Sequence, residues 1–216
     1  MEITNIKIEP CILEKDDPTW RFALGASPVS EGLIVSIETD KKLTGFGYAS
    51  ATAHMGASLE GLTGTLERLV PHIKKHDPLS MTAIRRDMDR ALLGNNQAKA
   101  AIDSALFDLA AKFMKVPLHC LFGGAVRTQF PVLRILAIKT PREMAAQAQI
   151  LFDQGYRYFK IKVHGEINED IACVRAIRRQ LGDEANLTID ANQSYSPKDA
   201  IAALNGMADY RIDLVE

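Results

Sequence analysis

The strongest constraint on the fold is a regular alternation of short apolar segments with amphipathic segments, which begins at Pro131. It predicts strands over 132–138, 158–163, 186–190 and 212–216, separated by helices over 142–152, 168–181 and 197–207. Successive strands start roughly 26 to 29 residues apart, close to the ~30 residues per unit of a (β/α)₈ barrel. A doubly wound open sheet alternates in the same way, so periodicity leaves the two folds evenly matched, although the Gly-rich first turn of a dinucleotide fold is absent.

The earlier part of the chain has a different pattern. Apolar alternation predicts three strands, over 3–13, 32–39 and 43–49. Apolar residues at helical spacing predict three helices, over 59–70, 84–92 and 97–113. We therefore expect an α+β domain over residues 1–125, followed over residues 126–216 by an incomplete (β/α)₈-type TIM barrel.

The number of barrel strands indicates that a barrel would be incomplete in this sequence. About four strands precede the last residue, Glu216, whereas a closed barrel of this type has eight. We therefore expect the chain to be a fragment, with roughly four further βα units, on the order of 100 or more residues, in the intact protein.

Composition narrows the classes of partner. The chain has 216 residues, of which 47% are hydrophobic, and a net charge of -1. Interspersed charges of both signs create no long-range field for phosphates, so nucleic acid and anionic membranes are poor partners. No apolar stretch approaches the ~20 residues that span a bilayer. We expect a cytoplasmic protein that binds a small molecule.

The segment from Tyr158 to Val163 carries two lysines, Lys160 and Lys162, on one face of its predicted strand, because side chains alternate. On an isolated strand this would be a solvated face. In a parallel barrel, helices cover the outside and side chains fill the inside, so such lysines meet bulk water only at the open end. They would need carboxylates or an anionic ligand nearby, and we expect their mutual repulsion to lower their pKa values toward that of a useful base.

The next two predicted strands end in carboxylates, Asp190 and Glu216. Asp190 alone would be read as a turn or capping residue, and Glu216 alone, as a single terminal Glu, would mean little. Together with the lysines they form a cluster at the carboxyl ends of consecutive strands, where barrel enzymes build their sites. Oxygen ligands from separate strands suit a hard cation such as Mg²⁺. A base facing such a cation indicates removal of a proton beside a substrate carboxylate.

These residues resemble one family. The motifs Lys160-Ile161-Lys162, Asp190-Ala191-Asn192-Gln193 and Leu214-Val215-Glu216 are similar to the muconate-lactonizing subgroup of the enolase superfamily. That subgroup includes muconate cycloisomerases, dipeptide epimerases and N-acylamino acid racemases. The resemblance covers nearly the whole chain and corresponds to the N-terminal portion of such proteins.

The resemblance implies a role for each motif residue. Lys162 would be the general acid or base on one face of the substrate, and Lys160 would support it electrostatically. Asp190 and Glu216 would be the first two ligands of Mg²⁺, with Mn²⁺ as a substitute, and Asn192 would support the metal or substrate from behind them. The family's third carboxylate ligand and its opposite-face lysine lie on later strands, so we expect these 216 residues alone to be inactive.

The resemblance also implies two substrate-selecting loops, over 16–29 and 49–56, and the end of the first barrel strand reaches the same mouth. The candidate substrate-binding residues are Trp20, Arg21, Phe22, His54, Met55 and Ile138.

Several reactions fit these residues. Racemisation or epimerisation of an amino-acid derivative is the first hypothesis, since lysines on opposite faces can remove a proton and return it on the other side. A muconate-type cycloisomerase is the alternative. A Schiff-base barrel aldolase using Lys160 or Lys162, and a non-catalytic fragment, are rivals of other classes. The intact protein is expected to form homo-oligomers.

Overall fold

The computed structural model describes all 216 residues, which pack as two compact units. Unit 1 consists of Met1–Glu14 and Val29–Thr128, and unit 2 of Lys15–Pro28 and Gln129–Glu216. The division at residues 125 and 126 stays a prediction. The segment Lys15–Pro28 packs with the C-terminal part, although in the sequence it falls between two strands of the N-terminal sheet.

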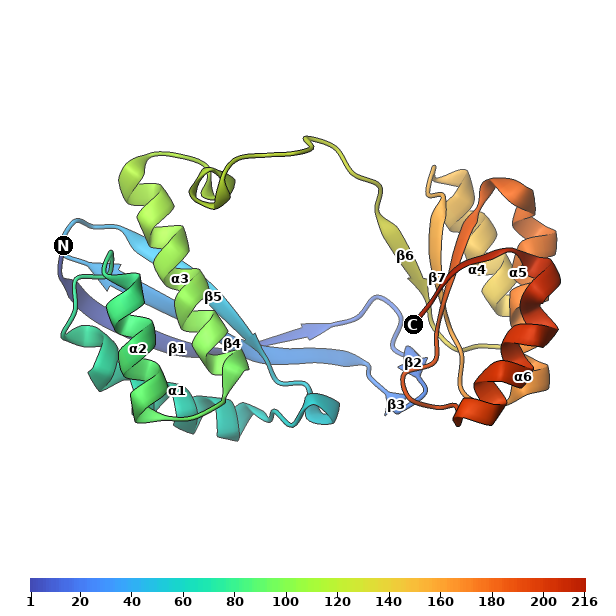
Figure 1. Ribbon diagram of the computed structural model, residues 1–216, viewed down its shortest axis with the longest axis horizontal. Coiled ribbons are helices and arrows are strands. Elements are labelled where there is room, and N and C mark those ends of the chain that lie inside the picture. The colour runs from blue at the N-terminus through green and yellow to red at the C-terminus, as the bar shows by residue number, and fades with distance from the viewer. The chain divides into compact units, whose positions relative to one another are not determined.

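Unit 1 contains a three-stranded antiparallel sheet in the order β1-β4-β5 (Figure 1). Its strands are β1 (Ile3–Glu14), β4 (Val29–Thr39) and β5 (Thr44–Ser50). The inward side chains of the central strand are Leu33, Val35 and Ile37, all fully buried. Their alternation along the strand is the pattern that predicted this sheet.

Helices cover one face of this sheet. They are α1 (Leu59–Lys74), α2 (Met81–Ala91) and α3 (Asn96–Met114). Helices α1 and α3 pack on the strands, and α2 packs against these two helices (Figure 1). The expected α+β domain is confirmed.

Unit 2 contains a four-stranded parallel sheet in the order β6-β7-β8-β9. Its strands are β6 (Leu133–Leu136), β7 (Tyr158–Lys162), β8 (Asn186–Asp190) and β9 (Ile212–Val215). The connecting helices are α4 (Pro141–Asp153), α5 (Ile167–Leu181) and α6 (Pro197–Met207). Alternate strand residues, including Phe159, Ile161, Leu187 and Ile189, form a buried core with these helices. This arrangement confirms the expected partial barrel.

A buried arginine fixes the amino ends of the last two strands. The Arg178 guanidinium in α5 donates to four backbone carbonyls, those of Gly182, Ala185, Tyr210 and Arg211, at 2.7 to 2.9 Å. Its planar fork of donors suits this multiple recognition. The start of β9 is thereby tied to α5 at the end of the sheet opposite the lysines and carboxylates.

Two predicted segments differ from the structure. The first barrel strand ends at Leu136 instead of residue 138, because the Ile138 N–H donates to the Arg21 carbonyl at 3.1 Å and not to β7. The long connection after β1 contains a small hairpin, β2 (Arg21–Phe22) and β3 (Gly25–Ala26).

The chain also contains four short 3₁₀ helices, which are η1 (Ala53–Met55), η2 (Leu118–Phe122), η3 (Gly182–Glu184) and η4 (Ala208–Tyr210). None of the helices combines the length and apolar character that crossing a membrane requires.

Candidate active site

Lys162 lies at the carboxyl end of β7 among oxygen acceptors. Its Nζ is 2.5 Å from Asp190 Oδ2 and 2.7 Å from Asn192 Oδ1. The sheet register pairs Lys162 directly with Asp190, so neighbouring strands deliver the two side chains to the same place. Lys162 is 8% exposed and Asp190 is 2% exposed. The Lys162 amino group is therefore held in a nearly dry environment by a carboxylate and an amide.

Lys160, two residues earlier on the same face, bridges two carboxylates. Its Nζ hydrogen-bonds Glu216 Oε2 and lies 3.5 Å from Asp190 Oδ2. Pairing with β8 holds the Glu216 backbone, since its N–H donates to Ile189 and its carbonyl accepts from Ala191, at 2.9 and 3.1 Å. Two lysines and two carboxylates thus alternate across three adjacent strand ends.

This alternation decides the charge state of Lys160. Burial acts to lower its pKa, but the hydrogen bond to Glu216 and the negative charges of Asp190 and Glu216 raise the pKa above its ordinary value. The prediction that mutual repulsion lowers the lysine pKa is therefore wrong for Lys160. The physical reason is that carboxylates stand next to the lysines and outweigh the like charge.

The charge state of Asp190 depends on the same contacts. Burial acts to raise its pKa, but hydrogen bonds from Lys162 and from the Asn192 backbone, with the charges of both lysines, hold the pKa below its ordinary value. The Asn192 N–H reaches Asp190 Oδ1 at 3.0 Å. Asp190 therefore stays an anion with one oxygen facing the lysines and the other facing the following loop.

The carboxylates match part of a metal site. No three His, Cys, Asp or Glu side chains converge closely enough to hold a metal ion by themselves. Asp190 and Glu216 nevertheless share one cation, the Lys160 ammonium, so their oxygens already face a common positive charge. Mg²⁺ is often bound by one or two carboxylates plus water and substrate oxygens. The donor set fits Mg²⁺ as two of its ligands.

The segment Lys15–Pro28 places aromatic rings beside the lysines. Lys162 Nζ lies 5.9 Å from the centre of the Phe22 ring, and the Trp20 and Phe22 rings are 5.7 Å apart. Lys15 Nζ lies 3.9 Å from the Trp20 ring centre and donates to the Ser27 carbonyl at 2.6 Å. Of the predicted substrate-binding residues, the structure thus brings Trp20 and Phe22 toward the lysine cluster.

Lys139, just after β6, holds this segment by its side chain. Its Nζ lies 2.8 Å from Asp17 Oδ2 and 3.0 Å from Thr19 Oγ1. Arg21 and Ile138 line an adjacent open hollow of about 900 Å³. The amino-acid sequence carries no signal for the pairing of Lys139 with Asp17, because 122 positions separate the two residues.

His54 and Met55, the remaining predicted substrate-binding residues, belong to unit 1. They lie in η1, where the Gln97 side chain donates to the Met55 carbonyl at 3.3 Å. The Met55 side chain is exposed. Their part in substrate binding stays a prediction.

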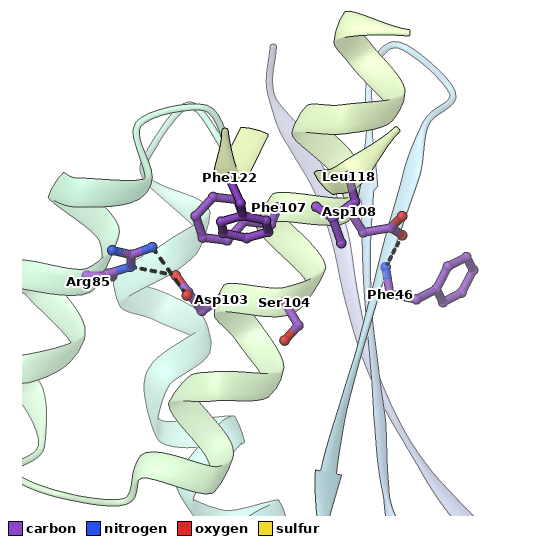
Figure 2. A pocket seen from close by; sticks show the side chains of 8 residues that line it. All are labelled: Phe46, Arg85, Asp103, Ser104, Phe107, Asp108, Leu118 and Phe122. Carbon is purple, nitrogen blue, oxygen red and sulfur yellow. Dashed lines mark hydrogen bonds and ion pairs between the residues drawn. The ribbon is translucent and has the colours of Figure 1, made fainter. Parts of the chain in front are cut away.

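Unit 1 has a separate open hollow of about 1050 Å³ (Figure 2). The rings of Phe107 and Phe122 form its apolar wall, 4.8 Å apart. Its charged groups are already engaged, since Arg85 forks onto Asp103 at 2.6 and 3.2 Å. None of the predicted site residues lines this hollow.

Two family models match the sequence. The model described as the N-terminal domain of mandelate racemase / muconate lactonizing enzyme matches residues 8–123. The model described as enolase C-terminal domain-like matches residues 143–216.

Individual relatives fall in the same group. The chain is 32% identical over 219 residues to an N-succinyl-L-Arg/Lys racemase of Bacillus cereus, which covers 100% of the chain and 59% of the relative. It is 37% identical over 199 residues to a hydrophobic dipeptide epimerase of Enterococcus faecalis, covering 92% and 56%. Muconate cycloisomerase 1 of Pseudomonas putida is 29% identical over 226 residues, covering 99% and 60%. The chain thus spans somewhat more than half the length of the curated relatives it matches.

A solved structure agrees with these matches. The dipeptide epimerase of Enterococcus faecalis, in complex with Mg and the dipeptide L-Leu-L-Tyr, superimposes with a TM-score of 0.94 at 34% identity. The match covers 100% of the present chain and 60% of the epimerase. The whole fold of the chain is therefore contained in that larger protein.

Proposed function

The chain belongs to the mandelate racemase / muconate lactonizing enzyme family, and on this premise we propose that it carries part of an active site that removes a proton next to a substrate carboxylate. The reaction would be racemisation or epimerisation of an amino-acid derivative, such as an N-succinyl amino acid or a dipeptide. The observation that carries the proposal is the alternating cluster of two lysines and two carboxylates on three adjacent strand ends. Relatives named as a racemase and an epimerase support it.

Each residue of the cluster has a proposed task. Lys162, as the neutral amine, would take the proton from the substrate α-carbon. Asn192 Oδ1, which accepts a hydrogen bond from Lys162 at 2.7 Å, would aim the amine. Lys160, which lies on the same face of β7, would contribute positive charge toward the substrate carboxylate. The buried setting strengthens these electrostatic contributions.

Asp190 and Glu216 would hold Mg²⁺, or Mn²⁺ in its place. When bound, the cation would offset both carboxylate charges and stabilise the negative charge that develops on the substrate carboxylate. Magnesium is present in the solved structure of the Enterococcus faecalis epimerase, which supports this choice of metal.

Substrate choice would fall to the loop that packs beside the lysines. Trp20 and Phe22 offer apolar surface near Lys162, and Arg21 offers a fork of donors to a distal polar or acidic group. Ile138 would contribute through its backbone, because its N–H donates to the Arg21 carbonyl and so holds the hairpin β2–β3 next to the end of β6. The relatives differ in the substrates that their names state, so the loop is where we expect specificity to be encoded.

A cycloisomerase acting on a muconate-type diacid is the second candidate, favoured by the match to muconate cycloisomerase 1. The Schiff-base aldolase is less well supported. At Lys160, imine formation would require a neutral amine, whereas the raised pKa of that residue favours its ammonium form. None of the relatives described above is named as an aldolase.

The first prediction concerns the base. In a protein of the relatives' full length that contains this chain, Lys162→Ala should reduce deuterium incorporation at the substrate α-carbon by about 10²- to 10⁴-fold, the usual contribution of a general base. Proton NMR in D₂O with a panel of N-succinyl amino acids and dipeptides measures this exchange.

Arg179→Ala is the matched control, because it removes an exposed cation from the last turn of α5. It should leave the exchange at the wild-type rate. Unchanged exchange in the Lys162→Ala protein would defeat the assignment of the base. Turnover of a muconate-type diacid, without α-proton exchange in the panel, would favour the cycloisomerase.

A further inference from the structure

A buried carboxylate near the site has no task in the proposed reaction. Asp170, in the first turn of α5, is 2% exposed. No lysine or arginine nitrogen lies within 4.0 Å of its oxygens, and the His164 ring Nδ1 lies 3.8 Å from Asp170 Oδ1. Burying an unpaired carboxylate is costly unless hydrogen bonds compensate. The bonds that Asp170 accepts therefore indicate what it does.

Asp170 accepts hydrogen bonds from two different loops. The backbone N–H groups of His164 and Gly165, in the loop after β7, reach its two oxygens at 3.1 and 3.0 Å. The Tyr195 hydroxyl, in the loop after β8, reaches Oδ2 at 2.7 Å. Burial and the Asp170 carboxylate both raise the Tyr195 pKa, so the hydroxyl stays a donor. One carboxylate thus ties together the loops that follow the two central strands.

The two loops are also in direct contact. Gly165 has a positive φ of 99°, and a Cβ built on it would lie 2.9 Å from the Ser194 carbonyl oxygen. Asn192 and Gln193 have φ values of 43° and 69°, in the left-handed region that non-glycine residues seldom adopt. Such conformations are strained and persist only where the surroundings enforce them.

We infer that Asp170 is a positioning residue for Lys162, because it fixes both the loop that follows Lys162 and the strained loop that presents Asn192 to it. Lys162 is two residues before His164, and Asn192 is three residues before Tyr195. The Lys162 Nζ to Asn192 Oδ1 distance of 2.7 Å depends on both loops keeping their places. The effect on catalysis rests on the proposed function, whereas the effect on the loops does not.

The test uses Tyr195→Phe, which removes one donor and keeps the ring, and Asp170→Asn, which keeps the shape and changes the acceptor. The control is Tyr156→Phe, a hydroxyl removal at a ring packed on the same core. In the full-length protein, Tyr195→Phe should speed amide hydrogen exchange at His164, Gly165 and Ser194, and Tyr156→Phe should not. Tyr195→Phe should also lower kcat by about 10- to 100-fold, the usual loss when a residue that orients a catalytic group is removed, with KM near the wild-type value.

A double variant and a third site make the outcome decisive. Asp170→Asn combined with Tyr195→Phe should lose little more kcat than the greater of the two single losses, because both break the same network. Gly165→Ala, which adds a Cβ against Ser194, should give the same pattern if Asp170→Asn does not fold. Wild-type amide exchange in Tyr195→Phe, or equal losses of kcat in Tyr195→Phe and Tyr156→Phe, would overturn the inference. If the unsubstituted protein exchanges no α-proton in the panel, the proposed function fails, and amide exchange still decides the role of Asp170.

Discussion

Single side chains hold the hairpin segment Lys15–Pro28 in place. Lys139 binds both Asp17 and Thr19, and Lys15 binds Ser27 while lying over Trp20. The hydrogen bonds from Lys139 and Thr19 hold the pKa of Asp17 below its ordinary value. Because this folded-state pKa is lowered, the stabilisation from the pair is present above the ordinary Asp pKa of about 3.9 and is lost as pH falls through the folded-state value.

The second prediction follows from this pair. Lys139→Met should make Trp20 more accessible to acrylamide quenching at pH 7, because the anchor of its loop is lost. In the wild-type protein the same increase should appear only on acidification below the ordinary Asp pKa of about 3.9, as the pH falls through the lowered folded-state pKa of Asp17. Tryptophan fluorescence measures both, since Trp20 is the only tryptophan in the chain.

Two controls separate anchoring from a general charge effect. Lys139→Arg should keep much of the protection, since guanidinium can also pair with Asp17. Lys198→Met removes an exposed lysine of the same unit and should behave as wild type. Equal quenching of Lys139→Met and wild type at pH 7 would show that the pair does not anchor the loop.

Close packing of α3 against β5 is a property of these elements as a pair. Gly45 and Gly47 face Ala105 and Ala101 of α3, with no room for a side chain between strand and helix. A Cβ at Gly47 would lie 1.8 Å from the Ala101 carbonyl oxygen, far inside contact distance. The glycines and alanines of these elements therefore set how near the helix can approach the sheet.

The third prediction tests this packing. Gly47→Ala should destabilise the chain by about 1 to 3 kcal/mol, because the helix backbone has to move to admit the methyl group. Gly64→Ala, at an exposed position of α1 with nothing within 4 Å of the new Cβ, should instead stabilise by up to about 1 kcal/mol through helix propensity. Urea unfolding monitored by circular dichroism measures both. Equal effects at the two glycines would contradict the packing argument.

The outer strand of the same sheet is protected against pairing with another chain. The Phe46 N–H donates to the Asp108 carboxylate at 2.9 Å (Figure 2). The Thr44 carbonyl accepts from Lys112 at 2.7 Å. Side chains of α3 therefore occupy backbone groups that an exposed edge strand would offer to a partner strand.

The whole molecule has two hydrophobic cores that share no buried residue. One lies between the sheet and helices of unit 1 and includes Leu69, and the other lies under the helices of unit 2 and includes Ile177. Trp20 packs with unit 2. Its fluorescence therefore reports on that unit.

The fourth prediction is that the two cores can be destabilised separately. Ile177→Ala should lower the urea midpoint of Trp20 fluorescence, because a buried Ile→Ala change costs about 2 to 5 kcal/mol. Leu69→Ala should leave that midpoint near the wild-type value and shift the part of the circular dichroism transition that unit 1 contributes. Equal shifts of the fluorescence midpoint would indicate one cooperative unit.

A homo-oligomeric state and a cytoplasmic location remain predictions.

The sequence by itself determined the local elements and the core of the candidate site. Strand alternation alone puts Lys160 and Lys162 on one face, and helical or alternating periodicity located the longer strands and the α-helices, but not the hairpin β2–β3, to within a few residues. Placement of Asp190 and Glu216 at neighbouring strand ends followed from the rule that parallel strands end at the same edge. These features depend on residue spacing along one segment, which the sequence displays directly.

Only the tertiary structure decided which distant side chains meet. Asp170 and Tyr195 are 25 positions apart, and Lys139 and Thr19 are 120 apart. In sequence, Asp170 looks like an ordinary acidic residue of a first helical turn, and segment 15–28 looks like part of the N-terminal domain. The direction of the Lys160 pKa shift also depended on distances, because neighbouring carboxylates outweigh a neighbouring lysine only when they lie closer. Such contacts arise from packing between elements, and residue spacing does not encode them.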